Sequence, residues 1–271
     1  MNDLLRQFLQ AAVQLAVYAA VFVPLERFFA LRQERVLRKE FWNDLGYYFL
    51  NGLGLSALLT IPVTGLALLA NRLVPQAVVQ AAVSLPFWLS LPLAIVIGDI
   101  GAYWGHRLSH KLLWLWRFHV VHHSPTHVDW LVNTRAHPID LVFTRLMGLA
   151  PLFALGLAQA RGGQGLPALL SLFMGLWSFV IHANVRWRFG WLEYLIATPA
   201  FHHWHHTNDE HRDRNFAAIF PFIDMMFGTF WLPKHFPPVY GVDKPPVDSF
   251  VGQLVDPLLP MRRPAAPIKE T

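Results

Sequence analysis

Residues 83–110, VSLPFWLSLPLAIVIGDIGAYWGHRLSH, join a long apolar stretch to a pair of histidines. A helix needs about 20 apolar residues to cross a bilayer, and 83–105 has that length. Polar side chains then follow one stripe of the expected helix at positions i, i+4, i+7 and i+11: Asp99, Tyr103, His106 and His110. The stretch therefore predicts a membrane helix that carries polar groups on one face and ends in histidine.

The composition of the whole chain agrees with a membrane protein. Of the 271 residues, 54% are hydrophobic and only 14% are charged, whereas a soluble domain carries about 25% charged residues. Five segments have the length and character of membrane helices: 8–30, 44–70, 83–105, 140–160 and 166–184. We read the first as a retained helix rather than a signal peptide, and glycines and a proline in the second predict a kink or a break. The short connection before the fifth segment predicts an antiparallel hairpin with the fourth.

Basic residues orient these segments, because arginine and lysine collect on the cytoplasmic side of a membrane. The first connection carries four of them: Arg32, Arg35, Arg38 and Lys39. If that side is cytoplasmic, alternation places 71–82 and 161–165 outside, and it places 106–139 and everything after 185 inside. The histidines fall on the same inner side. We therefore expect an all-α, multi-pass integral membrane protein of about four to five transmembrane helices, in the cytoplasmic (inner) membrane, with a histidine-rich helical cap on the cytoplasmic side.

The sequence excludes several classes of site, because it lacks the residues or motifs that they need. It contains no cysteine, which excludes disulfides, iron–sulfur clusters and a cysteine nucleophile. No H-E-x-x-H motif and no G-x-S-x-G elbow is present, which removes the usual zinc protease and serine hydrolase. The excess of basic residues is spread over short loops beside apolar segments, so membrane orientation explains it and we expect no nucleic-acid partner.

Three histidine boxes stand out from the other histidines. The first is H-x-x-x-H and the other two are H-x-x-H-H, and their members are His106 and His110; His119, His122 and His123; and His202, His205 and His206. Residues three and four apart share one face of a helix, so we expect each box to point its imidazoles in one direction, as metal ligands must. Eight or nine imidazoles exceed the four to six ligands of one ion, and two metals are implied. Imidazole alone does not choose among iron, copper, zinc and nickel.

These boxes, embedded in DIGAYWGHRLSH, WRFHVVHHSP, TPAFHHWHHT and NFAAIFPFIDMMFGTF, resemble those of the fatty acid hydroxylase superfamily, also called the sterol desaturase family. The resemblance covers 95–241. It implies a membrane-bound, non-haem di-iron enzyme that uses O2 to hydroxylate or desaturate a lipid, with zinc possible after purification. It also implies that the eight box histidines are ligands and that His182, at the inner end of the fifth segment, is an additional one.

Three further residues are candidates for catalytic roles. Asp99 lies at membrane depth and needs a partner, which is either a ligating imidazole or an arginine of a neighbouring helix. Tyr103 shares its stripe, and Asn215 belongs to the sequence DRN at 213–215, which resembles a recurring feature of the family. The roles of His137 and His203 stay open, and His127, His211 and His235 read as solvated loop histidines.

The sequence thus divides into N-terminal membrane helices (1–82), a catalytic region (83–243) and an irregular, proline-rich C-terminal tail (244–271). We expect lipid hydroxylation, with desaturation of a sterol or carotenoid as the alternative. Electrons must come from a separate donor, a reductase, ferredoxin, cytochrome or pterin, because the chain has no dinucleotide fingerprint after a strand and no cysteine for a cluster. A membrane haem electron carrier is a rival from another class, although it leaves the repeated boxes unexplained. A divalent-metal transporter is a second rival, but transporters bind near the bilayer midplane.

Overall fold

The computed structural model describes residues 2–159 and 165–259. Within these ranges the chain is helical, with two isolated β-bridges, Ala30 to Val185 and Thr207 to Tyr240, as the extended pairings, so the predicted all-α class is confirmed. The α-helices are α1 (Asp3–Phe28), α2 (Phe41–Leu73), α3 (Gln76–Ser84), α4 (Phe87–Lys111), α5 (Leu113–His123), α6 (Pro138–Ala154), α7 (Gly165–His182), α8 (Pro199–His205), α9 (Pro221–Met226) and α10 (Phe250–Val255). The 3₁₀ turns are η1 (Val132–Thr134), η2 (Leu157–Gln159), η3 (Gly190–Tyr194) and η4 (Asp256–Leu258).

Three helices, α1, α2 and α4, are long and apolar enough to cross a membrane. Large apolar side chains on them face outward, among them Ile61, which is 80% exposed, as expected of surfaces that contact lipid. Helix α6 has 17 residues and α7 has 18, slightly fewer than the about 20 that a span needs. The total of four to five spans therefore stays a prediction. The predicted outer turn at 161–165 lies, but for its last residue, outside the described residues.

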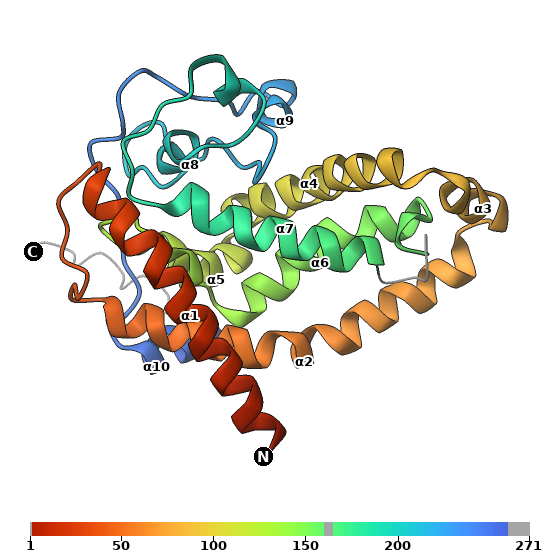
Figure 1. Ribbon diagram of the computed structural model, residues 1–271, viewed down its shortest axis with the longest axis horizontal. Helices are drawn as coiled ribbons and strands as arrows, with labels where there is room; N and C mark the ends of the chain where they lie inside the picture. The colour runs from red at the N-terminus through yellow and green to blue at the C-terminus, as the bar shows by residue number, and fades with distance from the viewer. Residues whose placement is uncertain (1, 160–164, 260–271) are drawn as a thin grey trace, which may run out of the picture.

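Helices α4, α6 and α7 lie side by side and form the centre of the molecule (Figure 1). Glycines let α4 and α6 approach closely, because a Cβ atom on Gly101 would lie 2.3 Å from the carbonyl oxygen of Met147, and one on Gly105 would lie 2.7 Å from the Met147 Cβ. Small residues at a helix interface have this effect in membrane proteins, where close packing replaces the hydrophobic drive. The contact sets the distance between the histidines at the end of α4 and the first turn of α6.

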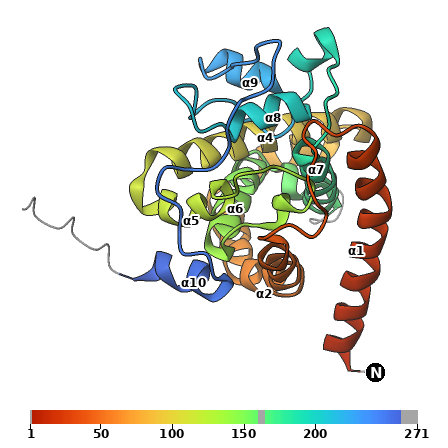
Figure 2. The same ribbon diagram turned by 90° about the vertical axis from the view of Figure 1, so that its left-hand side faces the viewer.

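Helix α2 is one unbroken helix through Pro62, so the predicted break is wrong. Helix α1 stands at the edge of the bundle (Figure 2), where the Tyr48 hydroxyl donates to the carbonyl oxygen of Ala11 at 2.9 Å. At its other end, the Glu26 carboxylate accepts from the backbone amides of Trp130 and Asn184. Both amides belong to segments that flank the histidines, so α1 holds the cap to the membrane helices.

The two ends of the bundle differ in kind. Helix α3 and η2 lie at one end and the histidine-bearing helices α5 and α8 lie at the other (Figure 1). At the first end, Gly156 adopts a φ of +72° and packs against the backbone of Val79, which joins α3 to the end of α6. The connection 71–82 is thus far from the boxes, as the alternating topology requires.

A buried ionic cluster joins the connection between α1 and α2 to the segment between α5 and α6. The Arg38 guanidinium contacts Asp44 at 2.6 Å and Asp129 at 2.7 Å, and Arg135 also binds Asp44. Breaking a buried pair on one side leaves an uncompensated charge and costs about 3–5 kcal/mol. The cluster fixes the short segment between η1 and α6 that contains Arg135, whose carbonyl oxygen accepts from His122.

The C-terminal tail is more regular than expected. Residues 250–258 form α10 and η4, and the carbonyl oxygen of Leu254 accepts from His137 Nε2 at 3.1 Å. The prediction of an irregular tail is wrong for this part, because Ser249 caps α10 and the Phe250 ring packs on Tyr47. The rest of the tail, 260–271, lies outside the described residues.

Candidate metal centre

All nine predicted ligands converge where the ends of α4 and α7 meet α5 and α8. They form two groups, and within each group the ligand nitrogens lie within 4.8 Å of one another. The five-histidine group consists of His106, His110, His119, His123 and His205. The four-histidine group consists of His122, His182, His202 and His206. Each group could hold a metal ion, and His182 joins the second group as the family resemblance implied.

The first box, His106 and His110, lies within one group as expected, but the two H-x-x-H-H boxes do not point all their imidazoles in one direction, which corrects the expectation from spacing. Residues four apart stay together, as His119 and His123 do in the five-histidine group, but His122, which is three residues from His119, belongs to the other group. Positions i+3 and i+4 differ by 100° around a helix. An H-x-x-H-H box on a short helix therefore supplies both groups at once, and the same division separates His205 from His206.

Hydrogen bonds fix the tautomer of six imidazoles. In each, Nδ1–H donates to an oxygen acceptor at 2.7–3.0 Å, so that Nε2 carries a lone pair. The acceptors are the carbonyl oxygens of Phe216 for His106, Arg135 for His122, Ser178 for His182 and Arg214 for His205, and the carboxylates of Asp213 for His110 and Asp140 for His119. Outer partners of this kind orient metal ligands and raise their basicity.

The Nε2 atoms then meet without a proton between them. His122 Nε2 and His182 Nε2 lie 3.3 Å apart, although both have already donated through Nδ1. Two lone pairs at this distance repel each other unless a cation lies between them. The Nε2 separations in the four-histidine group are 3.0–3.3 Å; around an ion with metal–nitrogen bonds of about 2.1 Å, edges of about 3.0–3.4 Å are expected. The residues present therefore fit a metal ion.

Burial favours the neutral form of several of these imidazoles, which is the form that ligation requires. Burial, followed by repulsion from the His119 imidazole, lowers the pKa of His122 to about 4. Burial likewise holds the pKa values of His205 and His206 well below the usual histidine value, with neighbouring imidazoles adding to the effect. Neutral nitrogens with fixed lone pairs leave the groups ready to bind a cation without first losing protons.

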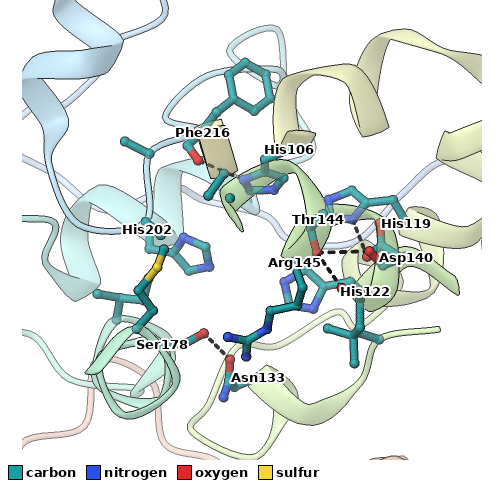
Figure 3. Close-up of a pocket in the computed structure, with 18 of the residues that line it drawn as sticks. His106, His119, His122, Asn133, Asp140, Thr144, Arg145, Ser178, His202 and Phe216 are labelled. Atoms are coloured by element: carbon teal, nitrogen blue, oxygen red, sulfur yellow. Dashed lines mark hydrogen bonds and ion pairs between the residues drawn. The ribbon is translucent and has the colours of Figure 1, made fainter. Parts of the chain in front are cut away.

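The groups open toward different surroundings. A cavity of about 190 Å³ between α4, α6 and α7 reaches His106 and His119 of the five-histidine group and His122, His182 and His202 of the four-histidine group. Figure 3 shows the imidazoles of His106, His122 and His202 around this cavity. Its remaining wall is mostly apolar and includes Ala102, Leu141, Leu149 and Met174. On the other side, a cleft of about 360 Å³ reaches only the five-histidine group, at His110, His123 and His205.

Asp99 and Tyr103 hold the loop that follows α8 rather than the imidazoles. The Asp99 carboxylate accepts from the backbone amides of residues 218–220 at 2.7–3.3 Å, so neither predicted partner, an imidazole or an arginine, is the one it has. The Tyr103 hydroxyl bonds Thr229 Oγ1 at 2.9 Å and accepts from Arg107. Of the four polar residues in this stripe along α4, Asp99 and Tyr103 bind the segment after α8, and His106 and His110 are candidate ligands.

Asn215 also has a structural role, because its side chain binds backbone groups of two other segments. Its side-chain amide donates to the carbonyl oxygens of Phe201 and Trp231 and accepts from the Trp231 amide, in a backbone with a φ of +57°. The carboxylates that do contact imidazoles are Asp140 and Asp213, each at 2.9 Å. Asp213 was within the expected DRN, whereas Asp140 was missed, although an acid in the first turn of an apolar segment was a signal for it.

The remaining histidines have structural contacts. His203 donates to the Ala183 carbonyl oxygen and accepts from the Tyr240 hydroxyl, and His137 caps α6 by accepting from the Ile139 amide. His127 is not solvated as predicted, since it is partly buried beside Glu40. His211 stacks on Trp231 at 4.1 Å, and only His235 is exposed.

Comparison with known proteins gives the same region. The family model "Fatty acid hydroxylase" matches residues 91–229, which include all nine histidines of the two groups. Ornithine lipid hydroxylase OlsE of Rhizobium tropici is 34% identical over 184 residues, which cover 64% of this chain and 51% of that protein. No solved structure matches the chain.

Two other relatives act, by name, on different lipids. Alkylglycerol monooxygenase of Danio rerio is 32% identical over 56% of this chain and 33% of its own length. Methylsterol monooxygenase 2-2 of Arabidopsis thaliana is 27% identical over 55% of this chain and 57% of its own length. The chain thus spans about half or less of the length of the first relatives that it matches.

Proposed function

Because this chain belongs to the fatty acid hydroxylase family, we propose that it is a membrane-bound, non-haem di-iron oxygenase that uses O2 to hydroxylate a C–H bond of a lipid. One observation carries the proposal. The lone pairs of His122 and His182 face each other at 3.3 Å in a group that borders an apolar cavity. That arrangement supports a metal ion beside the place where an alkyl chain would lie.

The two groups would hold one iron ion each, and bound iron would supply the activation of O2 that an unactivated C–H bond requires. The protein contributes positioning. Asp140 and Asp213 orient His119 and His110, respectively. The close packing of α4 on α6 at Gly101 and Gly105 holds His106 near these two histidines. Outer partners that lock imidazoles in this way have large effects on metal affinity and activity.

The cavity would bind the lipid and exclude water. It lies between α4, α6 and α7, and α4 is long and apolar enough to cross a membrane, so a lipid would enter from the bilayer rather than through the aqueous phase. Its apolar wall at Leu141, Leu149 and Met174 suits an alkyl segment, and the histidines occupy the end of that wall. Substrate and metals would therefore meet at the boundary between bilayer and cap.

Electrons would enter from the other side. We place the cap in the cytoplasm, where a reductase, ferredoxin, cytochrome or pterin could reach the cleft beside His110, His123 and His205. The Trp116 ring also lines this cleft, 5.1 Å from the His110 ring. A donor bound there would be separated from the lipid by the five-histidine group, which borders both spaces, so donor and lipid would not compete for one opening.

Metal content and lipid products test the proposal together. The chain, purified without oxygen, should carry about two metal ions, and cells that express it under isotopically labelled O2 should contain a lipid that has gained one labelled oxygen atom. His182→Ala should abolish this product, whereas the exposed His235→Ala should leave it unchanged.

Other outcomes separate the alternatives. A lipid that loses two hydrogens without gaining label would mean desaturation of, for example, a sterol or carotenoid. A visible haem spectrum, with no lipid changed despite a competent electron donor, would mean an electron carrier instead.

A further inference from the structure

Arg145 is a cation inside the helix bundle without an anionic partner. It lies on α6, five residues after Asp140, and it lines the cavity that reaches the histidines. Among the residues that the structure describes, no carboxylate lies within 4 Å of its guanidinium and no acceptor bonds it. The nearest acid along the chain, Asp140, uses its two oxygens for His119 and Ser109.

The guanidinium faces open space rather than the protein. In Figure 3 it extends across the cavity toward Ser178 and Asn133, with the imidazoles of His122 and His202 nearby. Ser178 Oγ donates to Asn133 Oδ1, so these two groups satisfy each other. The five N–H donors of an arginine side chain are left for whatever enters the cavity.

A second, larger cavity begins at the same place. It has a volume of about 500 Å³, lies between α1, α2 and α7, and shares with the first cavity the side chains of Asn133, Leu141, Arg145 and Ser178. Amide side chains line it, namely Gln7, Gln10, Gln14 and Asn51. Such polar groups are unusual between membrane helices. They form a hydrogen-bonding chamber that adjoins the apolar cavity at Arg145.

An unpaired arginine at this depth is costly for the fold, and ionisable groups inside membrane helices usually serve substrates or ions. On the basis of the proposed function, we propose that Arg145 binds the anionic group, a phosphate or carboxylate, of the lipid substrate at the junction of the two cavities. A guanidinium binds both groups through two parallel N–H···O bonds. The headgroup would occupy the amide-lined chamber, and the adjoining carbons would enter the cavity beside the histidines.

The test is binding, which needs neither turnover nor electrons. The full chain in a neutral detergent is titrated with dodecyl phosphate, with dodecanol and with inorganic phosphate. Dodecyl phosphate should bind at least about 10-fold more tightly than either of the others, the effect of one charged hydrogen-bonded pair. Arg145→Met should lose this preference and Arg145→Lys should keep part of it. Arg72→Met, a matched change at the exposed end of α2, should keep all of it.

A second measurement separates binding from a structural role. Without ligand, Arg145→Met should unfold at the same temperature as the parent chain or a higher one, because an apolar side chain replaces a buried, unpaired charge. Lower thermal stability, equal affinity for dodecyl phosphate and dodecanol, or equally tight binding of inorganic phosphate would each overturn the proposal. Because binding is measured without turnover, a chain that binds dodecyl phosphate but oxidises no lipid would refute the proposed function and leave this site standing.

Discussion

The five-histidine group and the four-histidine group share the second and third boxes, yet only the five-histidine group has carboxylates among the acceptors of its imidazoles. In the five-histidine group, carboxylates bind His110 and His119 at 2.9 Å. In the four-histidine group, backbone carbonyl oxygens bind His122 and His182, and His202 Nδ1 has no partner among the described residues. Carboxylate partners make an imidazole a stronger ligand. We therefore expect the five-histidine group to hold its metal more tightly.

The two groups also differ in the cavities that they border. Three of the four members of the four-histidine group border the cavity between α4, α6 and α7. The five-histidine group borders this cavity and also the cleft on the other side. A six-coordinate ion held by four imidazoles would have room for two further ligands, whereas one held by five imidazoles would have room for one. We therefore propose that substrate approaches the four-histidine group and that electrons enter at the five-histidine group.

The largest effect should come from His122→Ala. It removes one of the two opposed lone pairs, leaves three imidazoles in the four-histidine group, and should lower the metal content from about two ions per chain to about one with loss of lipid oxidation. Elemental analysis and labelled-oxygen mass spectrometry measure both effects. The control is His235→Ala. Retention of both metals by His122→Ala would show that the groups do not act as separate sites.

Asp140→Asn should act on the five-histidine group alone. An amide is a weaker acceptor for His119, and loss of such an outer partner typically lowers metal affinity by about 10–100-fold. Chelator titration should show one metal leaving earlier while the other is unaffected. Asp248→Asn, which disturbs an exposed ion pair with Lys39, is the control. If both metals leave earlier, the groups are coupled and the comparison between them fails.

Gly101→Ala should disturb the contact that sets the geometry of the five-histidine group. The new Cβ would lie 2.3 Å from a carbonyl oxygen of α6, and overpacking of this kind costs about 2 kcal/mol. Thermal unfolding in detergent measures it. Gly65→Ala, where a Cβ meets nothing within 4 Å, should be neutral or stabilising. Equal effects of the two changes would mean that α4 and α6 do not depend on close approach.

His127 lies outside both histidine groups, and its titration should make the stability of the fold depend on pH independently of metal binding. Burial, reinforced by Arg38 and Arg135 and opposed by Asp129, lowers its pKa from 6.5 to about 3, and Glu40 is 4.0 Å away. A histidine with a lowered folded pKa stabilises the fold above pH 6.5, and this contribution is lost as the pH falls toward 3. The loss is about 1 kcal/mol per pH unit. His127→Gln should remove that part of the pH dependence, and an unchanged slope of stability against pH would contradict it.

Much of the site was predictable because histidine is rare enough for its spacing to carry information. The nine candidate ligands, their common end of the bundle and the need for two ions follow from the boxes and from His182. The apolar segments likewise predicted the helices, since lipid allows few other structures. The break in α2 was wrongly predicted, because Pro62 is accommodated within a continuous helix.

The division of the second and third boxes between the two groups was decided by tertiary structure. Spacing places His119, His122 and His123 on one broad face, but the positions of α4, α7 and α8 determine which nitrogen each one meets. For the same reason, the sequence did not distinguish Asp99, which binds the backbone of a distant loop, from Asp140, which binds an imidazole.

By itself, therefore, the sequence determined the membrane character, the helical class and the set of histidines, because hydropathy and residue spacing are local properties. Only the tertiary structure decided which imidazoles lie in one group, which acids orient them, and where Arg145 faces a cavity without a partner among the described residues. Those are contacts between residues far apart in the chain, such as His110 with Asp213 and His122 with His182. They depend on how closely the helices pack, and in α4 and α6 that distance is set by glycines whose role appears only once the two helices meet.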